Sequence, residues 1–101
     1  GPNVTFTNDM VPRSKSYPMS FLQTIICQGA SIGANATIIA GNKIGAYAFI
    51  GAGSLITKNI PDNTVWYGTP ARLKGYITNN GILLDLHYKD KNGIKHMLKD
   101  D

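Results

Sequence analysis

An isoleucine recurs at every sixth residue through the middle of the chain, without a slip. The six occurrences are Ile26, Ile32, Ile38, Ile44, Ile50 and Ile56. Neither an α-helix, with a period of about 3.6 residues, nor an alternating strand, with a period of about 2, requires this spacing. A period of six indicates a repeating structural unit, each copy of which buries one large aliphatic side chain.

Two further columns of the repeat agree with this interpretation. The third residue after each isoleucine is Gly or Asn in five of six cases, and these residue types tolerate a positive φ. This column consists of Gly29, Asn35, Gly41, Tyr47, Gly53 and Asn59. The next column is mostly small, as a second inward position requires, and consists of Ala30, Ala36, Asn42, Ala48, Ser54 and Ile60. A corner in every hexad predicts a triangular coil of short strands, in which successive coils stack in parallel. We therefore expect an all-β fold, a parallel β-helix of hexapeptide repeats.

The repeat is too short to close a stable core alone. The range 26–61 makes two coils of three hexads each. At the usual spacing of strands, two coils are only about 10 Å tall. Either further coils upstream or identical chains packed against the open faces must complete the core, and we expect both in the intact protein.

An inserted loop is predicted near the N-terminus. The separation between Val4 and Ile26 is not a multiple of six, so the register of the coil is interrupted there. The intervening stretch 8–24 contains two prolines and three serines, and is expected to leave the coil as a loop. Its place suggests that it walls a substrate cleft. With this loop included, the coil domain is predicted to span residues 1–75.

Residues 76–101 are predicted to form a C-terminal extension. Apolar and polar residues alternate over Ile82–Tyr88, as in a half-buried strand. Asn92-Gly93 is typical of a two-residue hairpin turn. We expect a β-hairpin with a return strand at Ile94–Leu98, and an amphipathic helix over 94–100 is the alternative.

The charge distribution favours an anionic ligand. There are 10 Lys and Arg against 6 Asp and Glu, and the whole excess falls in residues 1–75. This suits a phosphorylated cofactor or substrate, although a solvated basic surface explains it as well. The basic residues are scattered and not interleaved with aromatic residues, which disfavours nucleic acid as a partner.

The location of the protein is predicted from its apolar runs and its cysteine. The sequence contains no apolar run of the length that spans a membrane, about 18 residues or more, so membrane insertion is not expected. No secretory leader is expected either. The single cysteine, Cys27, favours a reducing, cytoplasmic setting.

Several stretches of the chain resemble a known family. They are G-P-N-V-T-F-T-N-D (1–9), P-R-S (12–14), G-A-S-I-G-A-N-A-T-I (29–38), I-G-A-Y-A-F-I-G-A-G-S (44–54) and G-T-P-A-R-L-K-G (68–75). Together they resemble the hexapeptide-repeat acyltransferases, whose β-helix is left-handed. F-T-N-D with P-R-S resembles the branch that N-acetylates nucleotide-linked amino sugars for surface polysaccharides such as lipopolysaccharide. The resemblance implies acetyl-CoA as cosubstrate and a homotrimer. It also implies that several coils precede Gly1-Pro2, so that this chain is the C-terminal portion of a longer enzyme.

The resemblance makes Asn8 and Asp9 the candidate catalytic residues. In N-acetylation an amine attacks the thioester through a tetrahedral oxyanion, so the amine must be neutral and oriented. The Asn8 side-chain oxygen is a candidate to hold one amine hydrogen, and Asp9 to hold another or to anchor a sugar hydroxyl. A simple Asx turn is the alternative for both. Arg13 and Lys15 are candidates for the phosphates of the sugar nucleotide, against solvated loop charge.

The candidate coenzyme A residues are of two kinds. Small residues leave bare surface for the pantetheine arm, although tight coils need small residues anyway; they are Ala34, Gly51 and Ala52. The candidate side chains that bind the phosphates of coenzyme A are cationic, and they are Lys58, Arg72 and Lys74. Arg72 lies in P-A-R, which resembles the family's segment near coenzyme A, whereas Lys58 also fits an ordinary surface lysine. Backbone N–H groups are the expected oxyanion donors.

No metal site is predicted. His87 and His96 fall in the tail, without other His, Cys or paired carboxylates at ligand spacing. Neither is expected to be catalytic. Cys27 follows an inward isoleucine and is expected to face away from the interior, at a subunit contact rather than as a nucleophile.

The sequence therefore predicts a coenzyme-A-dependent N-acetyltransferase of a nucleotide-linked amino sugar. The alternative enzyme is an O-acetyltransferase of a sugar or serine hydroxyl, which needs a histidine base near the acceptor. The alternative from another class is a fragment that only trimerises. Saturable binding of acetyl-CoA separates that last class from the enzymes.

Overall fold

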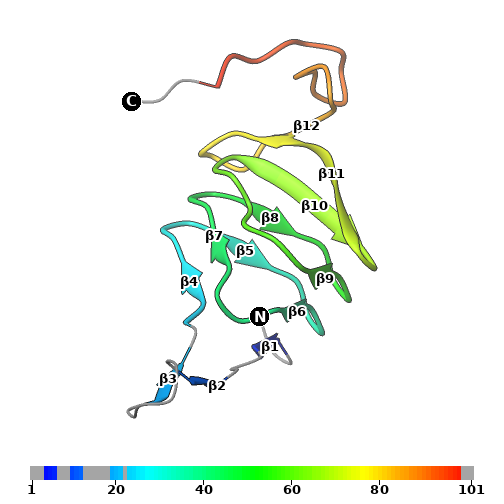
Figure 1. The fold of residues 1–101 in the computed structure, drawn as a ribbon. Coiled ribbons are helices and arrows are strands. Elements are labelled where there is room, and N and C mark those ends of the chain that lie inside the picture. The colour runs from blue at the N-terminus through cyan, green and yellow to red at the C-terminus, as the bar shows by residue number, and fades with distance from the viewer. Residues whose placement is uncertain (1–3, 7–9, 13–18, 22, 99–101) are drawn as a thin grey trace.

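The computed structural model describes residues 4–6, 10–12, 19–21 and 23–98. Within these ranges the regular structure is all β (Figure 1). The strands are β1 (Thr5–Phe6), β2 (Met10–Pro12), β3 (Met19–Phe21), β4 (Ile25–Ile26), β5 (Ser31–Ile32), β6 (Thr37–Ile38), β7 (Lys43–Ile44), β8 (Phe49–Ile50), β9 (Leu55–Ile56), β10 (Thr64–Gly68), β11 (Ala71–Ile77) and β12 (Leu83–Leu84). A search of these same residues finds no helix long and apolar enough to cross a membrane.

The central strands wind into coils with three sides. β4 pairs in parallel with β7, β5 with β8, and β6 with β9. Ser31 lies opposite Phe49, three hexads later, and the other two pairs have the same separation. One turn of the coil therefore takes three hexads. The all-β prediction is confirmed, and the pairing follows the period of the sequence.

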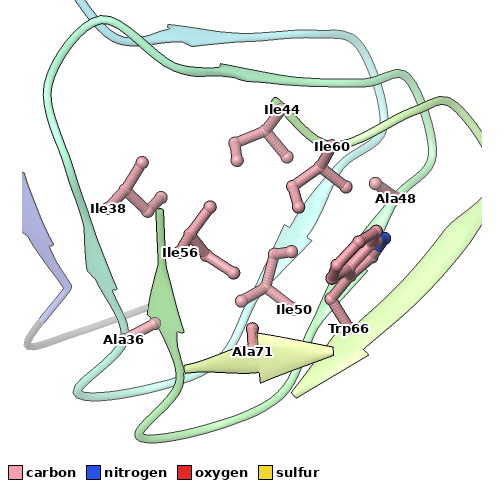
Figure 2. Close-up of a cluster of buried hydrophobic side chains, with 9 residues drawn as sticks. All are labelled: Ala36, Ile38, Ile44, Ala48, Ile50, Ile56, Ile60, Trp66 and Ala71. Atoms are coloured by element: carbon pink, nitrogen blue, oxygen red, sulfur yellow. The ribbon is translucent and has the colours of Figure 1, made fainter. Parts of the chain in front are cut away.

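The isoleucine ladder is the core of the coil. Ile38, Ile44, Ile50 and Ile56 are fully buried, with 0% exposure each. Figure 2 shows Ile38 with Ile56, Ile44 with Ile60, and Ile50 with Trp66 as the three sides of this core. Ile26, in β4, is 39% exposed. The predicted inward column is thus confirmed as fully buried at the last four of its six positions.

The predicted corners are confirmed at five of six positions. Positive φ is found at Gly29, Asn35, Gly41, Tyr47 and Gly53. Asn59 is the exception, and that prediction is wrong. The Asn59 Oδ1 atom accepts a hydrogen bond from the Lys43 N–H at 2.8 Å. Ile60 then bridges to Ile44, so this turn of the coil falls short of three full hexads where the corner was expected.

Extra chain lies between β1 and β4. Thr5 pairs with Thr37, which lies much further along the sequence than the three hexads of one coil turn. Phe6 nevertheless stands opposite Ile38, in the register of the isoleucine ladder. Within the extra chain, β2 and β3 pair antiparallel at the lower end of the coil (Figure 1). This is the stretch in which the sequence analysis places an inserted loop.

An antiparallel layer covers the upper end of the coil. β10 stacks in parallel on β8, with Trp66 opposite Ile50, and then pairs antiparallel with β11. β12 adds to the other edge of β11. The main antiparallel hairpin is therefore β10–β11, earlier in the chain than the hairpin predicted from the tail.

The tail is built from three turns of one kind. They span Thr78–Ile82, Asp85–Lys89 and Asp90–Ile94. In each five-residue turn, the N–H of the first residue donates to the carbonyl of the fifth residue. The N–H of the fourth residue donates to the carbonyl of the first residue. In each turn, a side-chain oxygen of the first residue also accepts a hydrogen bond from the N–H of the fifth residue. The fourth residue has a positive φ, as in a type I turn with a G1 bulge.

These turns correct the predicted strands of the tail. The expected strand Ile82–Tyr88 is reduced to Leu83–Leu84, because the Asp85 carboxylate accepts N–H groups that a strand would use. The return strand is reduced to one bridge between Lys89 and Lys95. The alternative helix is absent from residues 94–98, the described part of that segment.

Candidate functional site

A bare strip runs up the outer face of the sheet that contains β5, β8 and β10. Gly33 and Gly51 follow the inward Ile32 and Ile50, so they face outward, one above the other. A Cβ atom at Gly33 would stand 2.5 Å from the Ala52 nitrogen. The close stacking of the coils therefore requires glycine here and leaves main chain at the surface.

The three small residues predicted to face the coenzyme lie together along this strip. Ala34 and Ala52 lie at stacked corners, since the Ala34 carbonyl accepts the Gly53 N–H at 2.9 Å. Ala52 is exposed, whereas Ala34 and Gly51 are partly buried. These residues offer a smooth surface with no side chain larger than a methyl group.

A patch of one aromatic ring and two cations stands at the upper end of the strip. Tyr67 lies directly above Gly51, at which a Cβ would come within 2.6 Å of the Tyr67 Cβ. Tyr67 is 48% exposed, and the Lys74 Nζ lies 5.3 Å from the centre of its ring. Arg72 is the cross-strand partner of Tyr67 and is exposed as well. Tyr67, Arg72 and Lys74 are called the aromatic-cationic patch below.

Lys58 lies apart from this patch. Its Nζ stands 5.7 Å from the centre of the Trp66 ring. Trp66 points into the core with 9% exposure, whereas the neighbouring Tyr67 points outward. Successive side chains of a strand point to opposite faces. The structure thus brings Arg72 and Lys74 together and leaves Lys58 on the other face of β10.

The predicted catalytic and acceptor-binding residues lie outside the described residues. Asn8 and Asp9 fall in the sequence between β1 and β2, and Arg13 and Lys15 fall between β2 and β3. Their roles stay predictions. The residues named above for the strip and the patch include no carboxylate or imidazole.

A concave surface that the sequence pattern did not predict lies between the coil end and the tail. This cavity has a volume of about 580 Å³, and its lining includes Trp66, Leu73, Tyr76, Tyr88 and His96. The Tyr76 and Tyr88 rings stack with centres 4.2 Å apart. The hydrogen bond with Tyr88, which favours the protonated hydroxyl, is the largest cause that raises the pKa of Tyr76, and burial adds to it. The alternation of the tail residues indicated a strand and gave no signal for this cavity.

Two aspartates hold the tail in shape. The Asp90 Oδ2 atom lies 2.8 Å from His96 Nε2, and the Asp90 Oδ1 atom accepts the N–H groups of Asn92 and Ile94. The His96 hydrogen bond, followed by the Ile94 N–H, lowers the pKa of Asp90. The N–H groups of Lys89 and His87 lower the pKa of Asp85 in the same way.

The described part of the chain offers no cluster for a metal ion. No group of three or more His, Cys, Asp or Glu side chains gathers within residues 4–6, 10–12, 19–21 and 23–98. Cys27 is a free thiol and is partly buried. Its predicted place at a subunit contact stays a prediction.

Known proteins match the repeat and its flanks. Residues 23–58 match the family described as bacterial transferase hexapeptide (six repeats). The dTDP-3-amino-3,6-dideoxy-alpha-D-galactopyranose 3-N-acetyltransferase of Aneurinibacillus thermoaerophilus is 64% identical over 60 residues, which are 59% of this chain and 31% of that protein. The galactoside O-acetyltransferase of Lactococcus lactis subsp. lactis is 37% identical over 84 residues, 79% of this chain and 41% of that protein.

A solved structure agrees with these sequence matches. A galactoside acetyltransferase in complex with coenzyme A is 34% identical and superposes with a TM-score of 0.62. The match covers 74% of this chain and 40% of that one. The chain thus spans less than half the length of each of these three proteins. Together, the matches show that this chain is similar to hexapeptide-repeat transferases, and the relatives named here are acetyltransferases.

Proposed function

We propose that this chain is part of an acetyl-CoA-dependent N-acetyltransferase that acts on a nucleotide-linked amino sugar. The observation that carries the proposal is the 64% identity over 60 residues to an enzyme named for that reaction on a dTDP-linked 3-amino sugar. The product is an acetamido sugar for surface polysaccharide, and the enzyme works in the cytoplasm. The left hand of the coil and a homotrimer belong to the same proposal.

The bare strip is the proposed path of the coenzyme. A thin pantetheine arm runs along Ala34, Gly51 and Ala52, where main-chain groups are within reach of its amides. The thioester end points toward the lower end of the coil, where β1, β2 and β3 lie (Figure 1). In a trimer a neighbouring coil supplies the opposite wall of this cleft.

The chemistry needs little from the protein beyond orientation. The Asn8 side-chain oxygen holds the neutral amine through one of its hydrogens, and Asp9 holds a second hydrogen or a sugar hydroxyl. The amine nitrogen forms a bond to the thioester carbon, and backbone N–H groups stabilise the oxyanion. The carbon–sulfur bond then breaks, and the proton lost by nitrogen ends on the thiolate of coenzyme A. Arg13 and Lys15 bind the acceptor phosphates.

O-acetylation of a sugar hydroxyl is the second candidate. The 37% identity over 84 residues to a galactoside O-acetyltransferase favours it, because that match covers more of this chain. A hydroxyl needs a general base. Of the described histidines, His96 is engaged by Asp90 and His87 lies in an exposed turn, both in the tail. The base would then have to come from another part of the protein.

The test is thiol release from acetyl-CoA by the full protein. Acceptors are UDP- and dTDP-linked amino sugars, each paired with the counterpart that carries a hydroxyl in place of the amine. Release with amino sugars alone is expected. Release with the hydroxyl counterparts instead would replace the proposal with O-acetylation. Absence of both release and saturable acetyl-CoA binding would mean that the chain serves assembly only.

A further inference from the structure

The cavity between the coil end and the tail, called the tail cavity here, lies on the face of β10 and β11 opposite the aromatic-cationic patch. Trp66 pairs across the two strands with Leu73, and both line the cavity. Tyr67 pairs with Arg72, and both belong to the patch. Because successive side chains of a strand point to opposite faces, the sheet separates the tail cavity from the bare strip.

An irregularity in β11 turns a second aromatic ring toward the cavity. Where the register shifts, β10 advances by one residue and β11 by two, and the residue left without a partner is Lys74. Leu73 and Tyr76 consequently share one face of the sheet, although strict alternation would place them on opposite faces. Tyr76 lies opposite Thr64, and both line the tail cavity. Tyr88 of the tail stacks on Tyr76 and doubles this aromatic wall.

The polar atoms of the aromatic walls are satisfied within the protein. The Trp66 Nε1–H group donates to the Thr64 hydroxyl at 3.0 Å, and that hydroxyl donates to the Pro61 carbonyl at 2.7 Å. The hydroxyls of Tyr76 and Tyr88 hydrogen-bond to each other. These walls therefore offer a ligand apolar and aromatic surface.

The charged groups of the cavity favour an anion. The ionisable side chains in its lining, besides the two tyrosines, are Asp62, Lys95 and His96. The Asp62 Oδ1 atom accepts the Ala46 N–H at 2.7 Å, and His96 Nε2 lies 2.8 Å from the Asp90 carboxylate. Within the described residues, the Lys95 ammonium group has no carboxylate partner. The cation that remains for a ligand is therefore Lys95, and it suits a carboxylate.

We propose that the tail cavity binds a small aromatic carboxylate, with its ring against Tyr76 and Tyr88 and its carboxylate at Lys95. The volume of about 580 Å³ lies within the range of about 300–1,000 Å³ that is usual for small-molecule sites. Aromatic walls with a cation beside them match a planar apolar body that carries one negative charge. The site is separate from the bare strip, so the inference does not rest on the proposed function.

The experiment measures binding of three probes to the full protein by calorimetry. 3-Phenylpropionate carries the carboxylate, 3-phenylpropionamide is its neutral counterpart, and 3-phenylpropylamine carries a positive charge. The carboxylate is expected to bind most tightly and to remain bound in the presence of saturating coenzyme A and dTDP. Its binding should also raise the melting temperature, because the ligand binds the folded state alone.

The charge is tested at Lys95. Lys95→Met keeps the apolar stem and removes the ammonium group. It should weaken the carboxylate about fivefold, the upper range for an exposed ion pair, and leave the amide unchanged. Lys91→Met removes another exposed lysine of the tail that does not line this cavity. This matched control should bind all three probes as the wild type does.

The aromatic wall is tested at Tyr76. Tyr76→Leu keeps an apolar side chain and removes the ring, so it should weaken all three probes by up to about tenfold, the scale of a lost aromatic pair. Tyr76→Phe keeps the ring and should retain the affinity. Because the stack with Tyr88 also holds the tail, the melting temperature of each variant is measured without ligand. If Tyr76→Leu does not fold, the exposed Lys95 still provides the test.

Four outcomes would overturn the inference. Failure of the wild type to bind 3-phenylpropionate would show that the cavity takes no such ligand. Tighter binding of the amine would assign the charged end of the ligand to Asp62. Equal weakening in Lys95→Met and Lys91→Met would reduce the preference to the general charge of the tail. Displacement of the carboxylate by coenzyme A or dTDP would place the probe on the acetyl-transfer surface.

Discussion

The ring of Tyr47 lies against the backbone of Gly29, so closely that a Cβ atom at Gly29 would stand 2.4 Å from the Tyr47 Cδ1 atom. Both residues have a positive φ, and they occupy the same corner in successive coils. The Tyr47 N–H donates to the Gln28 carbonyl, and the Tyr47 hydroxyl accepts from the Gln28 side chain at 3.2 Å. The absence of a side chain at Gly29 therefore makes room for the ring of a residue that rarely adopts this backbone conformation.

Gly29→Ala is expected to destabilise the protein more than Gly53→Ala. Both glycines are at corners with positive φ, which costs an alanine about 1–2 kcal/mol. Only at Gly29 does the new methyl group meet a ring, since nothing lies within 4 Å of a Cβ at Gly53. Overpacking adds about 1–3 kcal/mol. Denaturant unfolding of both variants checks this, and equal losses would show that Tyr47 moves aside freely.

Truncation of the isoleucine ladder should be costly. Ile56→Ala removes a side chain with 0% exposure and is expected to cost about 2–5 kcal/mol of unfolding free energy. The matched change Ile94→Ala removes a side chain that is 59% exposed and should cost far less. Thermal unfolding at one protein concentration compares the two. A large loss for Ile94→Ala would reveal that another surface covers the tail.

Acid should loosen the tail before the coil. The pKa of Asp90 is lowered in the folded state by His96 and by the Ile94 N–H. In the interval between its folded pKa and its unfolded pKa of about 3.9, the unfolded state binds more protons. This stabilisation is therefore present above about pH 4 and is lost as the pH falls through the folded pKa.

Asp90→Asn tests this pH dependence. It removes the titrating group while keeping an oxygen that accepts N–H groups. The melting temperature of the variant should be lower than that of the wild type at neutral pH, and the difference should shrink as the solution is acidified below the unfolded pKa. Parallel curves for the two proteins would show that Asp90 does not contribute to acid sensitivity.

Asn8→Ala is expected to lower turnover more than it weakens coenzyme A binding. The side-chain oxygen is proposed to orient the attacking amine, which matters in the chemical step and not in cosubstrate binding. The rate constant at saturation and the dissociation constant of coenzyme A are measured side by side. A proportionate loss of both would assign Asn8 a structural role.

The sequence alone determined the coil, because its information is local and repeated. One isoleucine per hexad specifies an inward position, and the same register places the corner three residues later. The periodicity even placed Tyr47 at a corner that its residue type disfavours, since the coil on either side imposes the conformation. The separation between Val4 and Ile26, which is not a multiple of six, likewise indicated that an insertion interrupts the coil before the repeat.

Tertiary structure decided what lies at the two ends of the repeat, where non-local contacts outweigh local pattern. The Asn59 side chain accepts a hydrogen bond from the backbone N–H of β7, and the expected corner does not form there. As a result Val65, and not Tyr67, lies opposite Phe49. In the tail, side-chain oxygens of Thr78, Asp85 and Asp90 close three turns where alternation alone favours strands. The pairing of β10 with β11 brings Arg72 and Lys74 to Tyr67 and separates them from Lys58. Such registers depend on which strands meet across the sheet. The local sequence pattern does not specify these pairings, because they form only when distant segments pack into one core.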